Sequence, residues 1–202
     1  MLRLCFALIL VLFAAASCTT SDLGLELEAS PSRYGDADPQ NFGSRHPGTH
    51  AVHGVDVSKW QGYIDWKELK RNGVAFAYIK STEGGDLRDD RFTQYWDGAK
   101  RAGIPRGAYH FYYFCRTGAE QAAWFIRNTP KDPSALPPVL DMEWNHKSPT
   151  CKKRPPPATV RREMSVFLKR VERHYGKKPL IYTTVDFHRE NLEGHFKNYQ
   201  FW

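Results

Sequence analysis

An α/β fold, with strands and helices alternating along the chain, is the architecture that this sequence of 202 residues predicts. Three observations indicate it. Apolar, β-branched runs bounded by glycine or proline recur from residue 53 onward, and amphipathic stretches with helix start and stop signals lie between them. One run, Val74–Lys80, is apolar nearly throughout, which is typical of a strand buried on both faces of a parallel sheet.

The first four elements are bounded by clear local signals. A strand over 53–58 precedes a helix over 66–72, whose start resembles a capping box at Asp65 and Glu68 and whose stop is Gly73. The other elements expected here are the strand 74–80 and a helix over 90–102 that ends at Gly103.

The later elements repeat the pattern. They are a strand within 104–114, a helix over 117–128, a strand over 137–144, a helix over 158–175 and a strand over 179–184. Alanines at packing spacings favour the helix 117–128, and Gly176 ends the long amphipathic helix before it.

Five strands alternating with four helices imply βα units with right-handed crossovers. An open doubly wound sheet and a barrel both satisfy this pattern. No Gly-x-Gly-x-x-Gly follows the first strand, so nothing supports a dinucleotide site, and Gly84-Gly85 alone is too little for a phosphate loop. In a barrel, active residues would gather at the carboxyl ends of the strands.

Residues 1–17 are expected to be an export signal. After Arg3, an almost unbroken apolar run extends from Leu4 to Ala16. It is shorter than the roughly 20 residues that cross a bilayer and fits a secretory signal. Small residues before Cys18 predict lipidation of that cysteine, with ordinary cleavage as the alternative. We therefore expect an exported protein. It would lie in the periplasm of a bacterium, or be a lipoprotein anchored to the outer membrane, or be extracellular.

Residues 18–52 are rich in Ser, Asp, Gly and Pro and are expected to be a flexible tether. His46, His50 and His53 lie close together there, but a flexible linker gives a metal ion no fixed geometry. We expect no metal site and no cofactor.

Two cysteines, Cys115 and Cys151, remain in the folded part of the chain. In an exported protein two such thiols usually pair, and neither lies in a Cys-x-x-Cys spacing typical of a metal site. We expect a disulfide between them. Two buried free cysteines are the alternative.

The chain is basic, with 29 Lys and Arg against 22 Asp and Glu, a net charge of +7 and a pI near 9.2. Such a charge suits polyanions, including nucleic acids, anionic lipids and anionic wall polymers. The export signal and the lack of a recognised motif argue against a nucleic-acid partner. The basic segment Cys151–Pro157 could contact an anionic wall polymer, and a solvated loop is the plainer interpretation.

Three acidic residues lie at predicted strand ends. Asp141 and Glu143 are two apart, so both point to the same face of their strand, and Asp56 has the same place on the first strand. A raised-pKa acid beside an ionised one is what cleavage of a glycosidic bond requires. We expect Asp141 to stay ionised and to raise the pKa of Glu143 by like-charge repulsion. Surface acids or helix caps are the alternative.

Aromatic residues, 14% of the chain, also gather near the strand ends, where they can stack on sugar rings or simply fill a core. The candidates for substrate binding are Tyr78, Tyr109, Phe111 and Tyr182, with Trp144 beside them. Lys80 and Glu83 flank the end of the second strand and could form a rim ion pair or contact sugar hydroxyls. Alternation sends half of residues 110–114 to each face, without indicating which face is inside.

Several ordered motifs now give a resemblance. They are Gly54-Val-Asp-Val-Ser-Lys-Trp-Gln61, Ala77-Tyr-Ile-Lys-Ser-Thr-Glu-Gly84, Gly107-Ala-Tyr-His-Phe111, Pro138-Val-Leu-Asp-Met-Glu143 and Pro179-Leu-Ile-Tyr182. Together they closely resemble glycoside hydrolase family 25, the muramidase family of lysozymes, over about residues 53–202.

The resemblance implies an irregular (β/α) TIM-like barrel that cleaves the β-1,4 bond between N-acetylmuramic acid and N-acetylglucosamine in peptidoglycan. By similarity, Glu143 matches the proton donor, and Asp56 and Asp141 match the other two acids. The resemblance leaves open whether a carboxylate or the substrate's own acetamido group attacks the anomeric carbon.

The resemblance also implies further strands and a late aspartate beyond this sequence, which stops at Phe201–Trp202 where the next strand would begin. We therefore expect a barrel that is incomplete at the C-terminus, in a monomer whose partner is the peptidoglycan glycan strand. A non-catalytic peptidoglycan-binding lipoprotein on the same fold is the alternative. The three intact acids favour the enzyme, and the absent segment favours the binding protein.

Overall fold

The computed structural model describes residues 49–202. The expected signal segment, Cys18 and nearly all of the expected tether lie outside the described residues. His50–Trp202 forms one compact unit. Among its helices none is both long enough and apolar enough to cross a lipid bilayer.

Five parallel strands form the main sheet, in the order β1-β2-β4-β5-β6. They are β1 (Gly54–Val57), β2 (Phe76–Glu83), β4 (Arg106–Phe111), β5 (Val139–Met142) and β6 (Leu180–Thr183). The two-residue strand β3 (Leu87–Arg88) folds back antiparallel on β2, and Phe201 makes a parallel bridge to Ile181 of β6.

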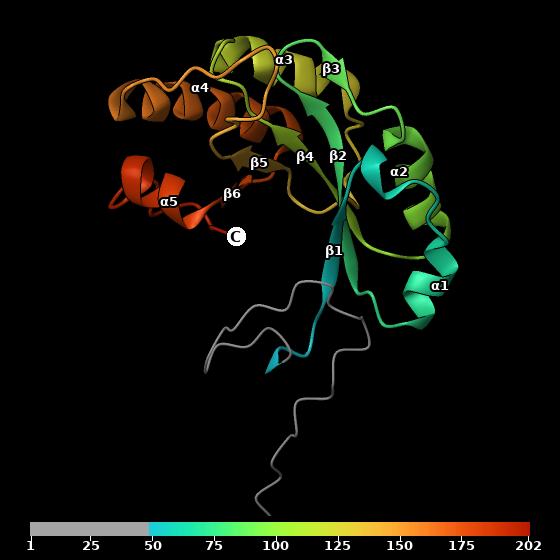
Figure 1. The fold of residues 1–202 in the computed structure, drawn as a ribbon. Coiled ribbons are helices and arrows are strands. Elements are labelled where there is room, and N and C mark those ends of the chain that lie inside the picture. The colour runs from blue at the N-terminus through green and yellow to red at the C-terminus, as the bar shows by residue number, and fades with distance from the viewer. Residues whose placement is uncertain (1–48) are drawn as a thin grey trace, which may run out of the picture. The chain divides into compact units, whose positions relative to one another are not determined.

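The strand order decides between the two architectures that the sequence pattern allowed. Each main strand lies beside the one before it in the chain, whereas a doubly wound sheet reverses direction at a switch point. The sheet curls, and the helices follow its outer side (Figure 1). This is the wall of an incomplete α/β barrel, as expected.

Four longer helices cover one side of the sheet (Figure 1). They are α1 (Trp66–Arg71), α2 (Phe92–Arg101), α3 (Gly118–Asn128) and α4 (Pro157–Tyr175), and the shorter turns are η3 (Lys59–Gln61), α5 (Val185–Phe187) and the π-helical turn η4 (His188–Leu192). Asp65 caps α1 by accepting from the backbone N–H groups of Lys67 and Glu68, both at 3.0 Å. The expected return bond of a capping box is absent, because Glu68 accepts from Arg71 and Asn72 instead.

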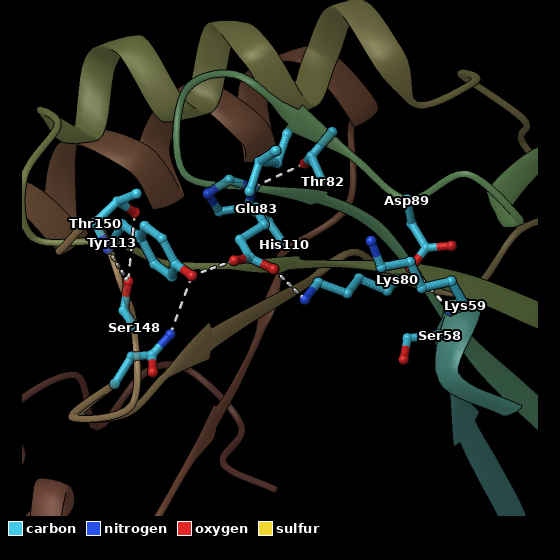
Figure 2. Close-up of polar contacts among 12 residues, drawn as sticks. Ser58, Lys59, Lys80, Thr82, Glu83, Asp89, His110, Tyr113, Ser148 and Thr150 are labelled. Carbon is cyan, nitrogen blue, oxygen red and sulfur yellow. Dashed lines mark hydrogen bonds and ion pairs between the residues drawn. The ribbon is translucent and has the colours of Figure 1, made fainter.

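The core between the sheet and α3 and α4 shows which way the central strand faces. His110 is fully buried there, and its ring stacks on Phe167 of α4 with the centroids 5.0 Å apart. Its Nδ1 lies 2.8 Å from Thr82 Oγ1 (Figure 2). Its Nε2 lies 3.1 Å from Gln121 Oε1. Burial lowers the pKa of His110 to about 4, so the ring is neutral at pH 7.

Because side chains alternate along a strand, Tyr109 and Phe111 face the other side of the sheet from His110. We call that side, away from α3 and α4, the inner face.

Two strand bounds differ from the prediction in ways that matter there. Strand β2 continues past Lys80 through an irregularity in its pairing and ends at Glu83, and β5 ends at Met142, so Glu143 is the first residue beyond its strand.

Candidate active site

Strand register brings the predicted site residues to the inner face. Residues directly opposite each other in neighbouring parallel strands share a face. The pairs are Asp56 with Tyr78, Lys80 with Tyr109, Glu83 with Phe111, Phe111 with Asp141, and Asp141 with Tyr182. Groups that are up to 126 positions apart in the chain, from Asp56 to Tyr182, therefore share one surface toward the carboxyl ends of the strands.

Asp141 is the most deeply buried of the three acids, with 8% of its surface exposed. Its Oδ1 has no hydrogen-bond partner within residues 49–202. Burial raises the pKa of Asp141 well above its usual value, and the charge of Glu143 raises it further. A buried carboxyl oxygen without a partner is costly to the fold, and such groups are enriched where a ligand completes the bonding.

Glu143 is half-buried and lies within electrostatic range of Asp141. Burial raises its pKa, while the positive charges of Lys80 and His146 lower it. Repulsion between the two carboxyls is mutual and opposes the ionisation of both. Burial is the first cause of each pKa shift, and it is deepest at Asp141, the carboxyl that the sequence analysis expected to stay ionised. The sequence could not indicate which of the two carboxyls lies deeper.

Asp56 lies at the β1 end of the inner face and is exposed to solvent. The protein around its carboxyl nevertheless raises its pKa through partial burial, and a hydrogen bond with its own backbone opposes this shift. The charge of Asp56 in turn raises the pKa of Asp141. The charges of Asp56 and Glu143 therefore both act on Asp141.

A chain of hydrogen bonds leads from the middle of the inner face to the loop after β5 (Figure 2). Lys80 forms an ion pair with one oxygen of Glu83, which is one of the two alternatives that the sequence left open, and the hydroxyl of Tyr113 donates to the other oxygen. Asn145 Nδ2 donates to the Tyr113 hydroxyl over 3.1 Å. Burial raises the pKa of Glu83, but the bonds from Lys80 and Tyr113 outweigh this effect and keep its pKa below the usual value.

Sequence reasoning missed Tyr113 and Asn145. A usable signal existed for Tyr113, which follows Tyr109 and Phe111 at the spacing of two that marks one face of an extended chain. Nothing local indicated Asn145, because its partner lies 32 positions away. Trp60, which is 80% exposed just beyond β1, was also missed.

The predicted aromatic residues differ in how open they are. Tyr78 is only 6% exposed, since its ring packs against Trp202 with centroids 5.4 Å apart, and burial raises its pKa to about 12. Tyr182 meets the same Trp202 edge-on. Phe111 lies under the ammonium of Lys80, with 4.8 Å from the nitrogen to the ring centroid. Tyr109 is partly buried, and burial raises its pKa.

The disulfide between Cys115 and Cys151 is confirmed, with the two Cα atoms 5.9 Å apart. It joins the loop after β4 to the loop after β5.

In the part of the chain that the structure describes, no group of three or more His, Cys, Asp or Glu side chains could hold a metal ion. His53 there bonds the backbone carbonyl of His50 at 2.6 Å.

An α/β-barrel wall with three carboxyls on its inner face defines a class of protein suited to chemistry at a glycosidic bond. Comparison with known proteins gives the family. The model of glycosyl hydrolases family 25 matches residues 55–202, and the chain belongs to that family.

Individual relatives show how much of the chain and of each relative is matched. The protein YegX of Escherichia coli strain K12 is 36% identical over 174 residues, which cover 84% of this chain and 61% of YegX. Lysozyme M1 of Streptomyces globisporus is 46% identical over 107 residues, 51% of this chain and 36% of the lysozyme. A solved family 25 glycosyl hydrolase from Bacillus anthracis is 38% identical, with a TM-score of 0.72 over 78% of this chain and 71% of that one. The chain thus spans about three fifths of the length of the YegX proteins it matches.

Proposed function

We propose that this protein is a muramidase, a peptidoglycan hydrolase that cleaves the β-1,4 bond between N-acetylmuramic acid and N-acetylglucosamine in wall turnover. The observation that carries the proposal is the Asp141–Glu143 pair on the inner face, with Asp56 in the same electrostatic environment. The names of similar proteins support it, since they include a lysozyme and N,O-diacetylmuramidases.

Glu143 is the general acid in this proposal. It is half-buried, directly follows β5, and has a pKa raised by burial, so it keeps its proton to a higher pH than a free glutamate. A proton from Glu143 to the bridging oxygen lets the leaving sugar depart as an alcohol.

Asp141 sets where the proton of the pair resides. Two close carboxyls titrate together, and with substrate absent the deeper Asp141 holds a proton more firmly. Its unpartnered Oδ1 can accept a hydrogen bond from an N–H or O–H group of the sugar. Such a bond stabilises ionised Asp141, so that the remaining proton resides on Glu143.

The anomeric carbon then has two available nucleophiles, a carboxylate or the acetamido oxygen of the substrate. Ionised Asp56 or Asp141 also stabilises the positive charge that develops on the sugar ring. The inner-face residues Tyr78, Tyr109, Phe111, Tyr182, Lys80 and Glu83 remain candidates for holding the glycan.

The identity of the new reducing ends tests the proposal. Purified peptidoglycan is incubated with the protein, reduced with borohydride and analysed by mass spectrometry. A muramidase yields reduced muramic-acid ends, whereas a glucosaminidase yields reduced glucosamine ends. A protein that only binds the wall yields neither, and that result would refute the proposal.

We further propose that residues 1–17 direct export, that 18–52 form a tether and that Cys18 carries a lipid. The domain 53–202 would then act as a monomer on peptidoglycan outside the cytoplasm. The small residues before Cys18 support this. Cys18→Ser should move the protein from the membrane fraction to the soluble one, and unchanged fractionation would count against lipidation. Size-exclusion chromatography with light scattering tests the monomer.

A further inference from the structure

The loop between β5 and α4 carries a concentration of positive charge. We call residues 145–156 the basic loop. It contains Lys147, Lys152, Lys153 and Arg154, with His146 besides, and no Asp or Glu. Among the described residues, none of the four cations has a carboxylate partner, whereas several other Lys and Arg side chains do. This charge is left unneutralised by the protein.

The basic loop has a fixed position despite its lack of regular structure. Cys151 is bonded to Cys115 and is 7% exposed. The hydroxyl of Ser148, which is 2% exposed, accepts from the N–H of Cys151 over 3.0 Å. Asn145 bonds Tyr113 at the other end of the loop, and the Arg154 guanidinium lies 5.1 Å from the ring centroid of Trp144. These anchors fix the loop next to Tyr113 and Trp144.

A small cavity opens between the loop and the end of β5. Its volume is about 80 Å³, and it is lined by aromatic and amide groups on one side and by Cys151, Lys152, Lys153 and Arg154 on the other. A single water molecule needs about 10–15 Å³ on the same measure, so the cavity has room for a carboxylate group with water around it.

The cavity adjoins the proposed acid. Trp144, Asn145 and His146 line it and directly follow Glu143, and the charge of His146 lowers the pKa of Glu143. Lys152, Lys153 and Arg154 line the same cavity and have no carboxylate partner among the described residues, so their charge is available to a ligand there.

We propose that the basic loop binds carboxylate groups of the peptide stem on the muramic acid that is cleaved at Glu143; this inference rests on the proposed function. The stem is attached to the lactyl group of the same sugar whose glycosidic bond is broken, so it must leave the inner face close to Glu143. Arginine and lysine bind carboxylates through charge-assisted hydrogen bonds, arginine often through two at once.

Three forms of one peptidoglycan, free of other anionic polymers, test the inference. The first has native stems, the second has its stem carboxylates converted to methylamides, and the third has its stems removed by an amidase. The variant is Lys152→Gln/Lys153→Gln/Arg154→Gln. The matched control is Lys67→Gln/Lys70→Gln/Arg101→Gln, which removes the same charge from exposed positions of α1 and α2. Thermal unfolding verifies that both variants fold.

For the parent, kcat/KM on the methylamidated and stripped forms should fall at least tenfold below that on the native form. On native stems, kcat/KM of the loop variant should be lower than that of the parent by the same factor. On the methylamidated and stripped forms, kcat/KM of the loop variant should not fall further. The control should behave as the parent does. Cosedimentation of the same proteins with the native and methylamidated forms, which keep their cross-links, should give the same ranking in the absence of turnover.

A loop variant that is equally impaired on native and stripped glycans would overturn the inference, because the loop would then act through the fold. Equal losses in the control would also overturn it, since net charge would explain them. Equal binding of the native and methylamidated forms by the parent protein would also overturn the inference. If the parent cleaves none of the forms, the proposed function fails, and cosedimentation still decides the inference. An anionic wall polymer can also be added as a competitor. If it abolishes binding by the parent but not by the loop variant, and methylamidation has no effect on binding, then the partner of the loop is the polymer. That result would show the inference to be wrong.

Discussion

Removal of the Cys115–Cys151 disulfide should destabilise the barrel wall by an amount that follows from its position in the chain. The two cysteines are 36 positions apart. In the chain-entropy account, closing a loop of that length stabilises the fold by about 4 kcal/mol at 25 °C. For a domain of this size each kcal/mol changes the melting temperature by roughly 2–4 °C, so we expect a loss of about 8–16 °C.

The assay is thermal unfolding followed by circular dichroism. The parent is measured with and without dithiothreitol, beside Cys115→Ser/Cys151→Ser. The reduced parent and the variant should melt at similar temperatures, and reductant should not affect the variant. A difference of less than about 2 °C between the oxidised and reduced parent would refute the reasoning, because the loop would then be restricted in the unfolded chain as well.

Three further outcomes are expected. Lys80→Gln removes a charge that lowers the pKa of both Glu143 and Asp141, so the alkaline limb of the kcat/KM profile should move to higher pH; a limb that stays or moves lower contradicts this. Asp141→Asn should abolish activity yet stabilise the fold at pH 7 by about 1–3 kcal/mol, since the amide cannot ionise in a position where burial opposes the charge of a carboxylate. The raised pKa of Asp141 means that ionisation opposes folding, so urea titrations should show this gain vanish as the pH falls below the unfolded carboxyl's pKa; a gain independent of pH refutes the explanation. Gly107→Ala would place a Cβ 2.2 Å from the ring of Tyr78. Such overpacking costs about 1–3 kcal/mol, so the melting temperature should fall. An unchanged melting temperature would contradict this, because it would show that the ring can move.

The elements that carry their own start and stop signals could be predicted from the sequence. Asp65 begins α1 and Gly176 ends α4, and both act as expected. The two-residue strand β3 has no periodicity to detect, and its existence depends on pairing with β2. Alternation alone could not orient the residues after Arg106, because the orientation is decided by His110 packing under α3 and α4.

The meeting of the three acids at one edge of the sheet could be predicted from the sequence, whereas their electrostatics could not. Strand ends predicted that Asp56, Asp141 and Glu143 would meet, because carboxyl ends of parallel strands lie at one edge. How far the pKa of each carboxyl is raised depends on its burial depth, and that depth arises from packing that only the folded sheet provides. For the same reason the bond between Tyr113 and Asn145 was invisible, since it joins two loops that only the folded sheet brings together.

The most direct test of the proposed chemistry is the activity of Glu143→Gln on intact peptidoglycan. Glutamine keeps the shape and hydrogen bonding of Glu143 but has no proton to transfer. The release of muramic-acid reducing ends should fall at least 10²-fold, the lower bound of about 10²–10⁴ that general acid catalysis supplies. Binding to peptidoglycan should be nearly unchanged, and the exposed control Glu193→Gln should retain the parent rate. A folded Glu143→Gln protein that released these ends at the parent rate would contradict the assignment of Glu143 as the acid.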